Sequence, residues 1–579
     1  MQVLKKLIVL SLPVAIGLCT HAQTITSVDS AIVIGKNYDG AVTVSGHVTD
    51  AASGKALQGV SITYKTYSAA ITDSLGAFKL RVPSVNVPIR FEADGYQLKE
   101  VALNGQSTVS AALYEDTYVS FYDMGVQPTG TVMKSKTPYA VTSIQTNGNW
   151  TNISETPSTY LQGRVAGLNA VRRSGTPNVG ASLSLRGISS LYANTQPLIV
   201  VDGILFDNRD YGGSIIANHY TDPLSTIDVR DIDNITVIKD GSSIYGTKGA
   251  NGVIIITTAR AKELGTKIDF ASYGGVNFTP DNLPLLNAAD YRVYLSDMLK
   301  SKGLSDAAIQ ALPYMNDDKN NPEYYKYHNN TDWQKQVFNK SYTKNIYLKV
   351  TGGDNIAKYA LSLGFMNNGS VTRNTDLTRY NMRFNGDLNL SPRMTATTNL
   401  SFTFNEQNIR DQGNISPKTN PILLALLKSP LVRTNDVSEK GIESPTFAER
   451  DTFGIGNPRS ITDVAEGNSK SYRFLGSIGF NYQLAKSFIL STTFGVTNDK
   501  VRENFFIPRK GVANDTLSTD IADSRLGSQL TSLFSLYNDT RLSFDKRIKN
   551  VHELSSRLGV RYLYTKSEQD YGLGFNSAI

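Results

Sequence analysis

The residues that could do chemistry in this sequence are spread too thinly to predict a catalytic or metal site. The chain has five histidines: His21, His47, His219, His328 and His552. None has the paired spacing that places two ligands on one metal ion. Asp202 and Asp240 each follow an apolar run, where an enzyme could place an acid, but no histidine or second carboxylate accompanies them. We therefore predict no catalytic residue, no metal site and no cofactor.

A cluster of glycines raises the possibility of a phosphate-binding loop. Gly246, Gly249 and Gly252 match neither the Walker pattern nor Gly-x-Gly-x-x-Gly, and no helix start follows the last of them. Glycine also serves tight turns, since it adopts positive φ without steric penalty. The cluster precedes the uninterrupted apolar run 253–258, so we predict turns that lead into a strand buried on both faces.

The N-terminus has the pattern of a secretory signal. Lys5 and Lys6 precede an apolar stretch over residues 7–18, and Ala22 offers a small residue for cleavage. The only cysteine, Cys19, lies within this segment, so we expect neither disulfides nor thiolate metal sites in the exported chain. No second apolar run reaches the ~20 residues that a membrane helix requires. If the exported chain sits in a membrane, it must do so as a closed barrel.

The composition of the 579 residues favours strands joined by polar loops. Thirty Tyr and 22 Phe stand beside 46 Gly and only 2 Trp. The net charge of +7 is modest for this length, and no run of Lys and Arg is dense enough to follow a phosphate backbone. We therefore expect no nucleic-acid partner.

Four regions follow the signal at residues 1–22. Residues 42–114 alternate in short runs broken by Gly, Pro and Asp-Ser turns, which predicts a small β-sandwich. Residues 115–158 are rich in Thr, Asn, Pro and Ser and form a linker, and residues 159–262 mix short strands with helical turns, as in a small α/β domain. Residues 267–579 show long alternation.

The long alternation gives each predicted strand one apolar and one polar face. Leu400 and Phe402 share one face of the run 394–404, while Ser401 and Thr403 share the other. In a soluble sandwich the apolar face would be the core, whereas in an outer-membrane barrel it would face lipid and the polar face would line water. Adjacent runs of about ten residues in an exported chain favour the barrel.

Two resemblances agree with this division. The order of Gly46, Gly54, Gly59 and Gly95 around the 72–78 turn resembles the carboxypeptidase-regulatory-like domain, without its enzyme. The next domain is similar to the plug of SusC/RagA-like TonB-linked outer-membrane proteins, a kind of TonB-dependent receptor. The matching positions are Arg164, Gly167, Arg186, Gly187, Asp202, Gly203, Tyr245, Gly246, Gly249, Asn251 and Gly252.

The second resemblance implies a fold and a function. The fold is mainly β: a β-sandwich, a mixed α/β plug, and a large antiparallel transmembrane barrel, of 22 strands in the family, that encloses the plug. The function is TonB-dependent import of a nutrient ligand, an oligosaccharide or a peptide, across the outer membrane of a Gram-negative bacterium. About ten strand-like runs follow residue 267, so we expect an incomplete barrel and the N-terminal portion of such a receptor.

The resemblance also implies partners: TonB with its inner-membrane energising complex, a SusD-like surface lipoprotein, and outer-membrane lipid. TonB adds a strand to an extended segment called the TonB box. The candidate segment is Thr117, Tyr118, Val119, Ser120, Phe121 and Tyr122, which an ordinary linker strand would explain equally well. Two alternatives stay open: a siderophore-type TonB-dependent receptor, and a secreted hydrolase that carries a regulatory β-domain.

Overall fold

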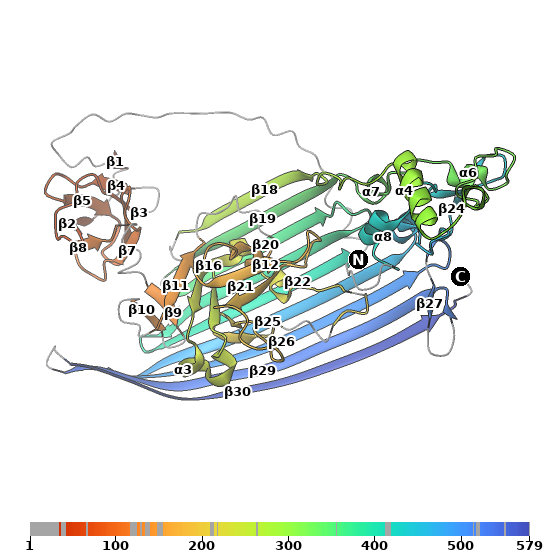
Figure 1. Ribbon diagram of the computed structural model, residues 1–579. Coiled ribbons are helices and arrows are strands. Elements are labelled where there is room, and N and C mark those ends of the chain that lie inside the picture. The colour runs from red at the N-terminus through yellow and green to blue at the C-terminus, as the bar shows by residue number, and fades with distance from the viewer. Residues whose placement is uncertain are drawn as a thin grey trace, which may run out of the picture. The chain divides into compact units, whose positions relative to one another are not determined.

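The computed structural model divides the chain into two compact units, residues 1–122 and 123–579, both drawn in Figure 1. The signal segment 1–22 and the candidate TonB box 117–122 lie outside the described residues. The structure describes residues 34–35, 42–64, 68–115, 124–127, 130–133, 139–146, 155–208, 213–216, 218–261, 265–354, 356–411, 418–512, 514–516, 521–548 and 552–577.

The first unit is a β-sandwich. One sheet has the order β1 (Ile34–Gly35), β4 (Ser68–Ile71), β3 (Ser61–Tyr64), β6 (Pro88–Glu92), β7 (Lys99–Ala102), and the other has the order β5 (Ala77–Val82), β2 (Val42–Asp50), β8 (Thr108–Leu113). The rings of Phe78 and Phe91 meet edge to face at 5.6 Å between the two sheets. Alternate residues of β2 and β5 are buried, because successive side chains of a strand point to opposite faces.

The second unit begins with a small domain that we call the plug, after the resemblance. Its sheet has the order β11 (Val141–Gln145), β16 (Ile232–Ile238), β17 (Val253–Thr258), β14 (Leu198–Val201), β15 (Ile204–Phe206). The run 253–258 is thus the central strand, with Ile254 and Ile256 fully buried. The other elements are the hairpins β9 (Met124–Gln127) with β10 (Gly130–Met133) and β12 (Leu168–Arg172) with β13 (Ala181–Leu185), the helices α2 (Pro157–Tyr160) and α3 (Ser242–Tyr245), and the 3₁₀ turns η4 (Pro223–Thr226), η5 (Val229–Asp231) and η6 (Gly246–Gly249).

Most of the rest of the unit is one antiparallel sheet, which we call the wall. The plug packs against one face of the wall (Figure 1). Nine strands of the wall lie in the described part of the chain, against about ten expected runs. Their order is β18 (Lys267–Asn277), β19 (Ser341–Gly353), β20 (Ala357–Gly369), β21 (Asp376–Ser391), β22 (Met394–Asn408), β25 (Glu466–Ala485), β26 (Phe488–Ile507), β29 (Arg525–Ile548), β30 (His552–Phe575). The predicted fold class is confirmed.

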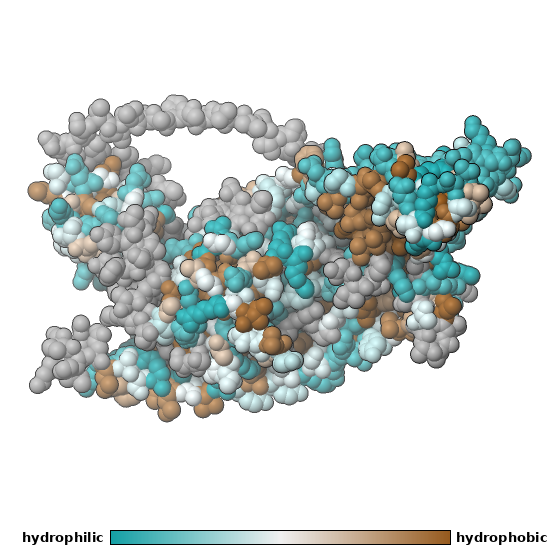
Figure 2. Space-filling model, in the orientation of Figure 1, coloured by the Kyte–Doolittle hydropathy of each residue, from teal (hydrophilic) through white to brown (hydrophobic). Residues whose placement is uncertain are grey.

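Long connections gather at one end of the wall and carry the remaining elements. These are α4 (Ala288–Ser301), α5 (Asp306–Gln310), α6 (Tyr324–Tyr327), α7 (Trp333–Val337), α8 (Pro421–Leu427), α9 (Pro458–Asp463), β23 (Asn435–Val437), β24 (Glu443–Phe447), β27 (Asp515–Thr516) and β28 (Ile521–Ala522). Figure 2 shows mostly polar residues over these helices, with an apolar area beside them. Trp333 joins two of the loops, because its indole N–H donates to the carbonyl of Ser429 at 2.8 Å. Among the described residues, none of the helices has the length and apolar character needed to cross a membrane.

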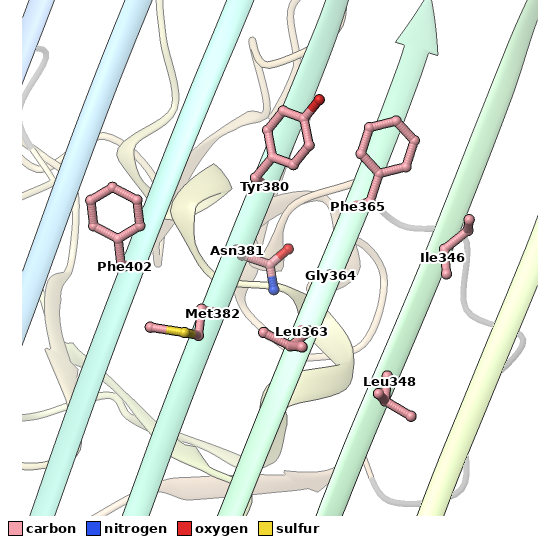
Figure 3. A pocket seen from close by; sticks show the side chains of 9 residues that line it. All are labelled: Ile346, Leu348, Leu363, Gly364, Phe365, Tyr380, Asn381, Met382 and Phe402. Atoms are coloured by element: carbon pink, nitrogen blue, oxygen red, sulfur yellow. The ribbon is translucent and has the colours of Figure 1, made fainter. Parts of the chain in front are cut away.

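The two faces of the wall differ as the alternation predicts. Leu400 and Phe402 are each 41% exposed on the outward face, and Figure 3 shows that face with its apolar side chains around a hollow of about 330 Å³. The inward face departs from the expectation that it lines water. Thr403 is buried, and its hydroxyl donates to the carbonyl of Thr226 in the plug at 2.8 Å. At Thr403 the polar face therefore contacts the plug rather than water, which agrees with the enclosed plug that the resemblance implies.

A row of aromatic rings crosses the outward face near its long-loop end. Phe365, Tyr380, Phe404 and Tyr472 are register partners on four successive strands, with ring centroids 5.2, 6.2 and 4.7 Å apart. Aromatic girdles of this kind flank the apolar band of outer-membrane barrels. The row therefore marks the level at which the apolar band ends.

We expect the outward face to contact lipid. Arginine in place of Leu400 should then cost roughly 2–4 kcal/mol near the bilayer midplane and lower the amount of assembled protein. The measurement is labelling of single cysteines in cells with a probe restricted to lipid. Leu400→Cys and Phe402→Cys should label strongly, while the inward neighbour Ser401→Cys should not. Equal labelling of both faces would contradict the assignment.

Candidate functional site: the interface between plug and wall

The interface begins at a two-residue turn between β14 and β15. Asp202 and Gly203 both have positive φ, +49° and +86°, as a type I′ hairpin turn requires, and Asp-Gly is a preferred sequence for it. The carboxylate of Asp202 accepts hydrogen bonds from the amide and the hydroxyl of Thr258, at 2.9 and 2.7 Å. The turn is thus tied to the end of the central strand, and its carboxylate lies 3.5 Å from Arg383 of the wall.

A buried cluster of charges continues the interface from Asp202. Asp228 accepts two hydrogen bonds from Arg230, at 3.0 and 2.8 Å, and lies 3.5 Å from Arg379 of β21. Asp231 accepts a hydrogen bond of 2.5 Å from the hydroxyl of Tyr347 and lies 3.8 Å from Arg383. All of these side chains are almost fully buried. We call Asp202, Asp228, Arg230, Asp231, Arg379 and Arg383 the ion cluster.

Two opposing effects set the pKa values of the carboxylates in the ion cluster: burial raises them, and the neighbouring guanidinium groups lower them. Burial alone would raise the pKa of Asp228, but the hydrogen bonds and the positive charge of Arg230 hold it below its usual value. For Asp231 burial dominates and raises the pKa, against the lowering effect of Arg383. The cluster contains three carboxylates and three guanidinium groups. Removal of one partner would leave an uncompensated buried charge, which is costly.

Three wall side chains also donate hydrogen bonds to backbone carbonyls of η4. Arg379 donates to the carbonyl of Ser225 at 2.8 Å, Thr403 to that of Thr226, and Arg473 to that of Pro223 at 3.2 Å. Arg473 is itself held by Asp499, at 2.6 and 2.7 Å. Within the turn the carbonyl of Pro223 also accepts a hydrogen bond from the hydroxyl of Thr226 at 2.8 Å, and the wall adds hydrogen bonds to the carbonyls at the end of this short turn.

Asp222 caps the start of η4 and is another buried carboxylate of the plug, outside the ion cluster. Its side chain accepts hydrogen bonds from the amide of Leu224 at 2.9 Å and from the hydroxyl of Ser158. Burial raises the pKa of Asp222 to about 6, while those hydrogen bonds oppose the shift. A Cβ on Gly180 would lie 2.1 Å from this carboxylate, so the adjacent loop must carry glycine there.

The predicted plug residues fall into separate groups. Asp202 and Gly203 reach the interface with the ion cluster, as described above. Arg186 forms a bidentate, half-exposed pair with Asp240, at 2.7 and 3.2 Å, and Gly187 follows it. The guanidinium of Arg164 lies 4.3 Å from the centroid of the Tyr160 ring. Gly167 follows Arg164 three residues later in the sequence.

The second half of the motif shapes the entry into β17. The ring of Tyr245 contacts the wall, with Arg561 4.8 Å from its centroid, and Gly246 opens η6. A Cβ on Gly249 would lie 2.5 Å from the carbonyl oxygen of Gly241. A Cβ on Gly252, whose φ is +85°, would meet Leu185 at 2.4 Å. The turns predicted for these glycines are present, and close packing adds a second reason for glycine.

Asn251 holds a loop of the plug in place. Its side-chain amide donates to the carbonyl of Asn194 at 2.6 Å, and its side-chain oxygen accepts a hydrogen bond from Ser189 at 2.8 Å. Asn251 therefore fixes the connection between β13 and β14 against the start of β17.

A cavity of about 540 Å³ lies where the plug meets the long-loop end of the wall. Its lining is mostly polar and comes from two plug loops and two wall loops, and Arg173 lies 4.4 Å over the ring of Tyr220. A volume of this size suits a small ligand. Among the described residues, no group of three or more His, Cys, Asp or Glu could hold a metal ion.

The wall arginines are the part of the site that the sequence did not identify as functional. Arg379 and Arg383 are four residues apart on the inward face of β21, among uncharged neighbours such as Asn381 and Asn385. Two like charges on one polar face of a long strand are the signal that could have singled them out. The partners could not be foreseen, because they lie elsewhere in the chain.

Comparison with known proteins shows which family the chain resembles. Residues 133–253 match the model of the TonB-dependent Receptor Plug Domain. The TonB-dependent receptor SusC of Bacteroides thetaiotaomicron is 30% identical over 356 residues, which are 61% of this chain and 32% of SusC. The chain is similar to the SusC/RagA-like TonB-dependent receptors. Receptors of this family are outer-membrane proteins of Gram-negative bacteria.

Further relatives agree. The TonB-dependent receptor P26 of Formosa agariphila is 25% identical over 473 residues, 80% of this chain and 43% of P26. The fold matches a solved structure, the RagAB peptide importer in its open-open state, with a TM-score of 0.62 at 20% identity, over 78% of this chain and 50% of the other. The chain thus spans less than half the length of these two curated relatives.

Proposed function

We propose that this chain acts in TonB-dependent import of a nutrient ligand across the outer membrane, and that it moves the ligand without altering it. The observation that carries the proposal is the interface of plug and wall. The plug is a folded domain whose contacts with the wall include buried ion pairs and hydrogen bonds, which can be broken and formed again without chemical change. A plug of this kind closes a pore at rest and opens it under force.

The source of the force, in this proposal, is TonB. TonB would pair with an extended segment ahead of the plug by adding a strand, and the energised inner-membrane complex would then pull on it. The segment at residues 117–122 is the proposed contact, because it precedes the first plug strands and its β-branched and aromatic residues favour an extended conformation.

The proposed ligand and the proposed surface partner are inferred from the similar proteins. The RagAB structures are described as a peptide importer, and we propose a peptide or an oligosaccharide as the ligand here. A SusD-like surface lipoprotein is the proposed partner, since the chain is similar to SusC. The helices α4 to α7 offer it an ordered surface at the long-loop end of the wall. The siderophore-type alternative has less support, because the sequence relatives include SusC.

The test is uptake in three strains: the parent, a strain without this receptor, and a strain without TonB. The probes are fluorescein-labelled casein peptides and, separately, labelled maltooligosaccharides. We expect at least one probe to enter the parent and uptake of that probe to fall at least tenfold in both deletion strains, while the strain without TonB still binds it at the surface. Uptake that depends on the receptor but not on TonB would overturn the proposal.

A further inference from the structure

We propose that the imported solute passes the plug along the wall strands β26, β29 and β30, through a cavity of about 550 Å³ that accepts uncharged polar chains. This inference rests on the proposed import function. It adds the side of the plug on which the path opens and the chemistry that the path accepts.

The wall side of the cavity carries a row of hydroxyl groups. Thr497, Ser535 and Thr565 are register partners on three adjacent strands, and all three line the cavity. The hydroxyls of Ser535 and Thr565 are 3.0 Å apart. Because register partners lie side by side, the three hydroxyls form one polar row across the wall at a single level.

The plug side of the cavity carries amide side chains. Asn208 donates to the side-chain oxygen of Gln196 at 2.9 Å, and Asn251 donates to the backbone of Asn194 at 2.6 Å. All four residues line the cavity opposite the hydroxyl row. A ligand hydroxyl or amide can replace such neutral hydrogen bonds at little net cost.

The remaining lining limits which ligands fit. Leu198, Leu205 and Leu533 give the cavity apolar surfaces between its polar groups. Of the described residues that line it, Asp207 and Lys248 are the charged ones. A neutral chain that bears hydroxyl or amide groups on an apolar frame matches this surface. Neutral sugar chains and extended peptides share that chemistry.

The wall holds the other side of the plug, which contacts β21, more firmly. There the wall contacts the plug through the ion cluster, whose ion pairs are buried. Breaking one of these ion pairs would leave an unpaired charge in the protein interior, which is costly. Among the described residues, the contacts of the plug with β26, β29 and β30 include no ion pair between plug and wall. Glu503 accepts hydrogen bonds from the hydroxyl of Ser214 and the amide of Ile215 at 2.8 and 3.1 Å. Gln529 donates to the carbonyl of Gly213 at 2.8 Å, and Arg561 lies over the ring of Tyr245. A pull on the plug should therefore separate it first from β26, β29 and β30.

The test compares two cysteines on the two sides of the plug. Ser535→Cys lies in the cavity, and Ser362→Cys lies on the inward face of β20, where Ser362 is 4% exposed beside the ion cluster. Both changes conserve size, and each variant also carries Cys19→Ser, since Cys19 is the only native cysteine. Fluorescein maleimide is added outside intact cells, with or without TonB. The medium contains either a casein digest or maltodextrins, so the two ligand sources are separated.

We expect TonB to speed labelling of Ser535→Cys at least fivefold in one of the two media, while Ser362→Cys stays unlabelled in both. TonB-dependent labelling of Ser362→Cys alone, or of both cysteines equally, would overturn the inference and leave the import function standing. Labelling of neither cysteine, or labelling of Ser535→Cys that does not depend on TonB, would also overturn it. Failure of the import function itself would show separately, as uptake that is independent of TonB in the parent strain.

Discussion

Arg383→Ala is expected to loosen the plug from the wall by about 3 kcal/mol. The guanidinium lies between two buried carboxylates, 3.5 Å from Asp202 and 3.8 Å from Asp231. Without it, both carboxylates stay in a space that water does not reach, with fewer positive charges to balance them. Removal of one partner from a buried pair costs roughly 3–5 kcal/mol, and the long distances here favour the lower end of that range.

The measurement is the urea concentration at which the plug opens in the assembled receptor. A cysteine at Val200, which is 1% exposed in the plug sheet, reports the opening through its reaction with a soluble maleimide. Arg383→Ala should lower the midpoint clearly, and addition of Asp231→Asn should restore part of it. Lys500→Ala removes an exposed charge from β26, which β22 and β25 separate from β21, and should leave the midpoint unchanged. If Arg383→Ala behaved like Lys500→Ala, the ion cluster would not hold the plug.

Features that depend on neighbouring residues were predictable from the sequence. The outward faces of the wall follow from alternation, so the sequence alone assigns Leu400 and Phe402 to the apolar face. The turn at Asp202 and Gly203 and the buried strand β17 follow from local residue types in the same way.

Contacts between distant segments were not predictable in this way. Arg379 reaches the carbonyl of Ser225 across 154 residues of sequence, and no local pattern joins the two. The same limit applies to the inward face of β22, where alternation alone predicts contact with water. Polar residues such as Thr403 indicate a face that is not lipid, but they do not distinguish water from a second domain that supplies hydrogen bonds.

Deletion of residues 117–122 is expected to abolish uptake, the largest effect that we predict. The segment ends where the second compact unit begins, so a partner that binds it can pull on the plug without first unfolding the β-sandwich. The deletion removes the proposed TonB contact and leaves the ion cluster and the cavity at the long-loop end unchanged in sequence. Surface binding of ligand should therefore persist.

The most direct test of the import mechanism measures uptake and surface binding of the same labelled probe in cells with and without residues 117–122. A control variant replaces these six residues with a Gly-Ser stretch of equal length, which keeps the spacing and removes the extended β-branched and aromatic character. The mechanism predicts that both variants reach the outer membrane at parental levels, bind the probe within twofold of the parent, and take up less than a tenth as much. Normal uptake in both variants would contradict a TonB contact at residues 117–122.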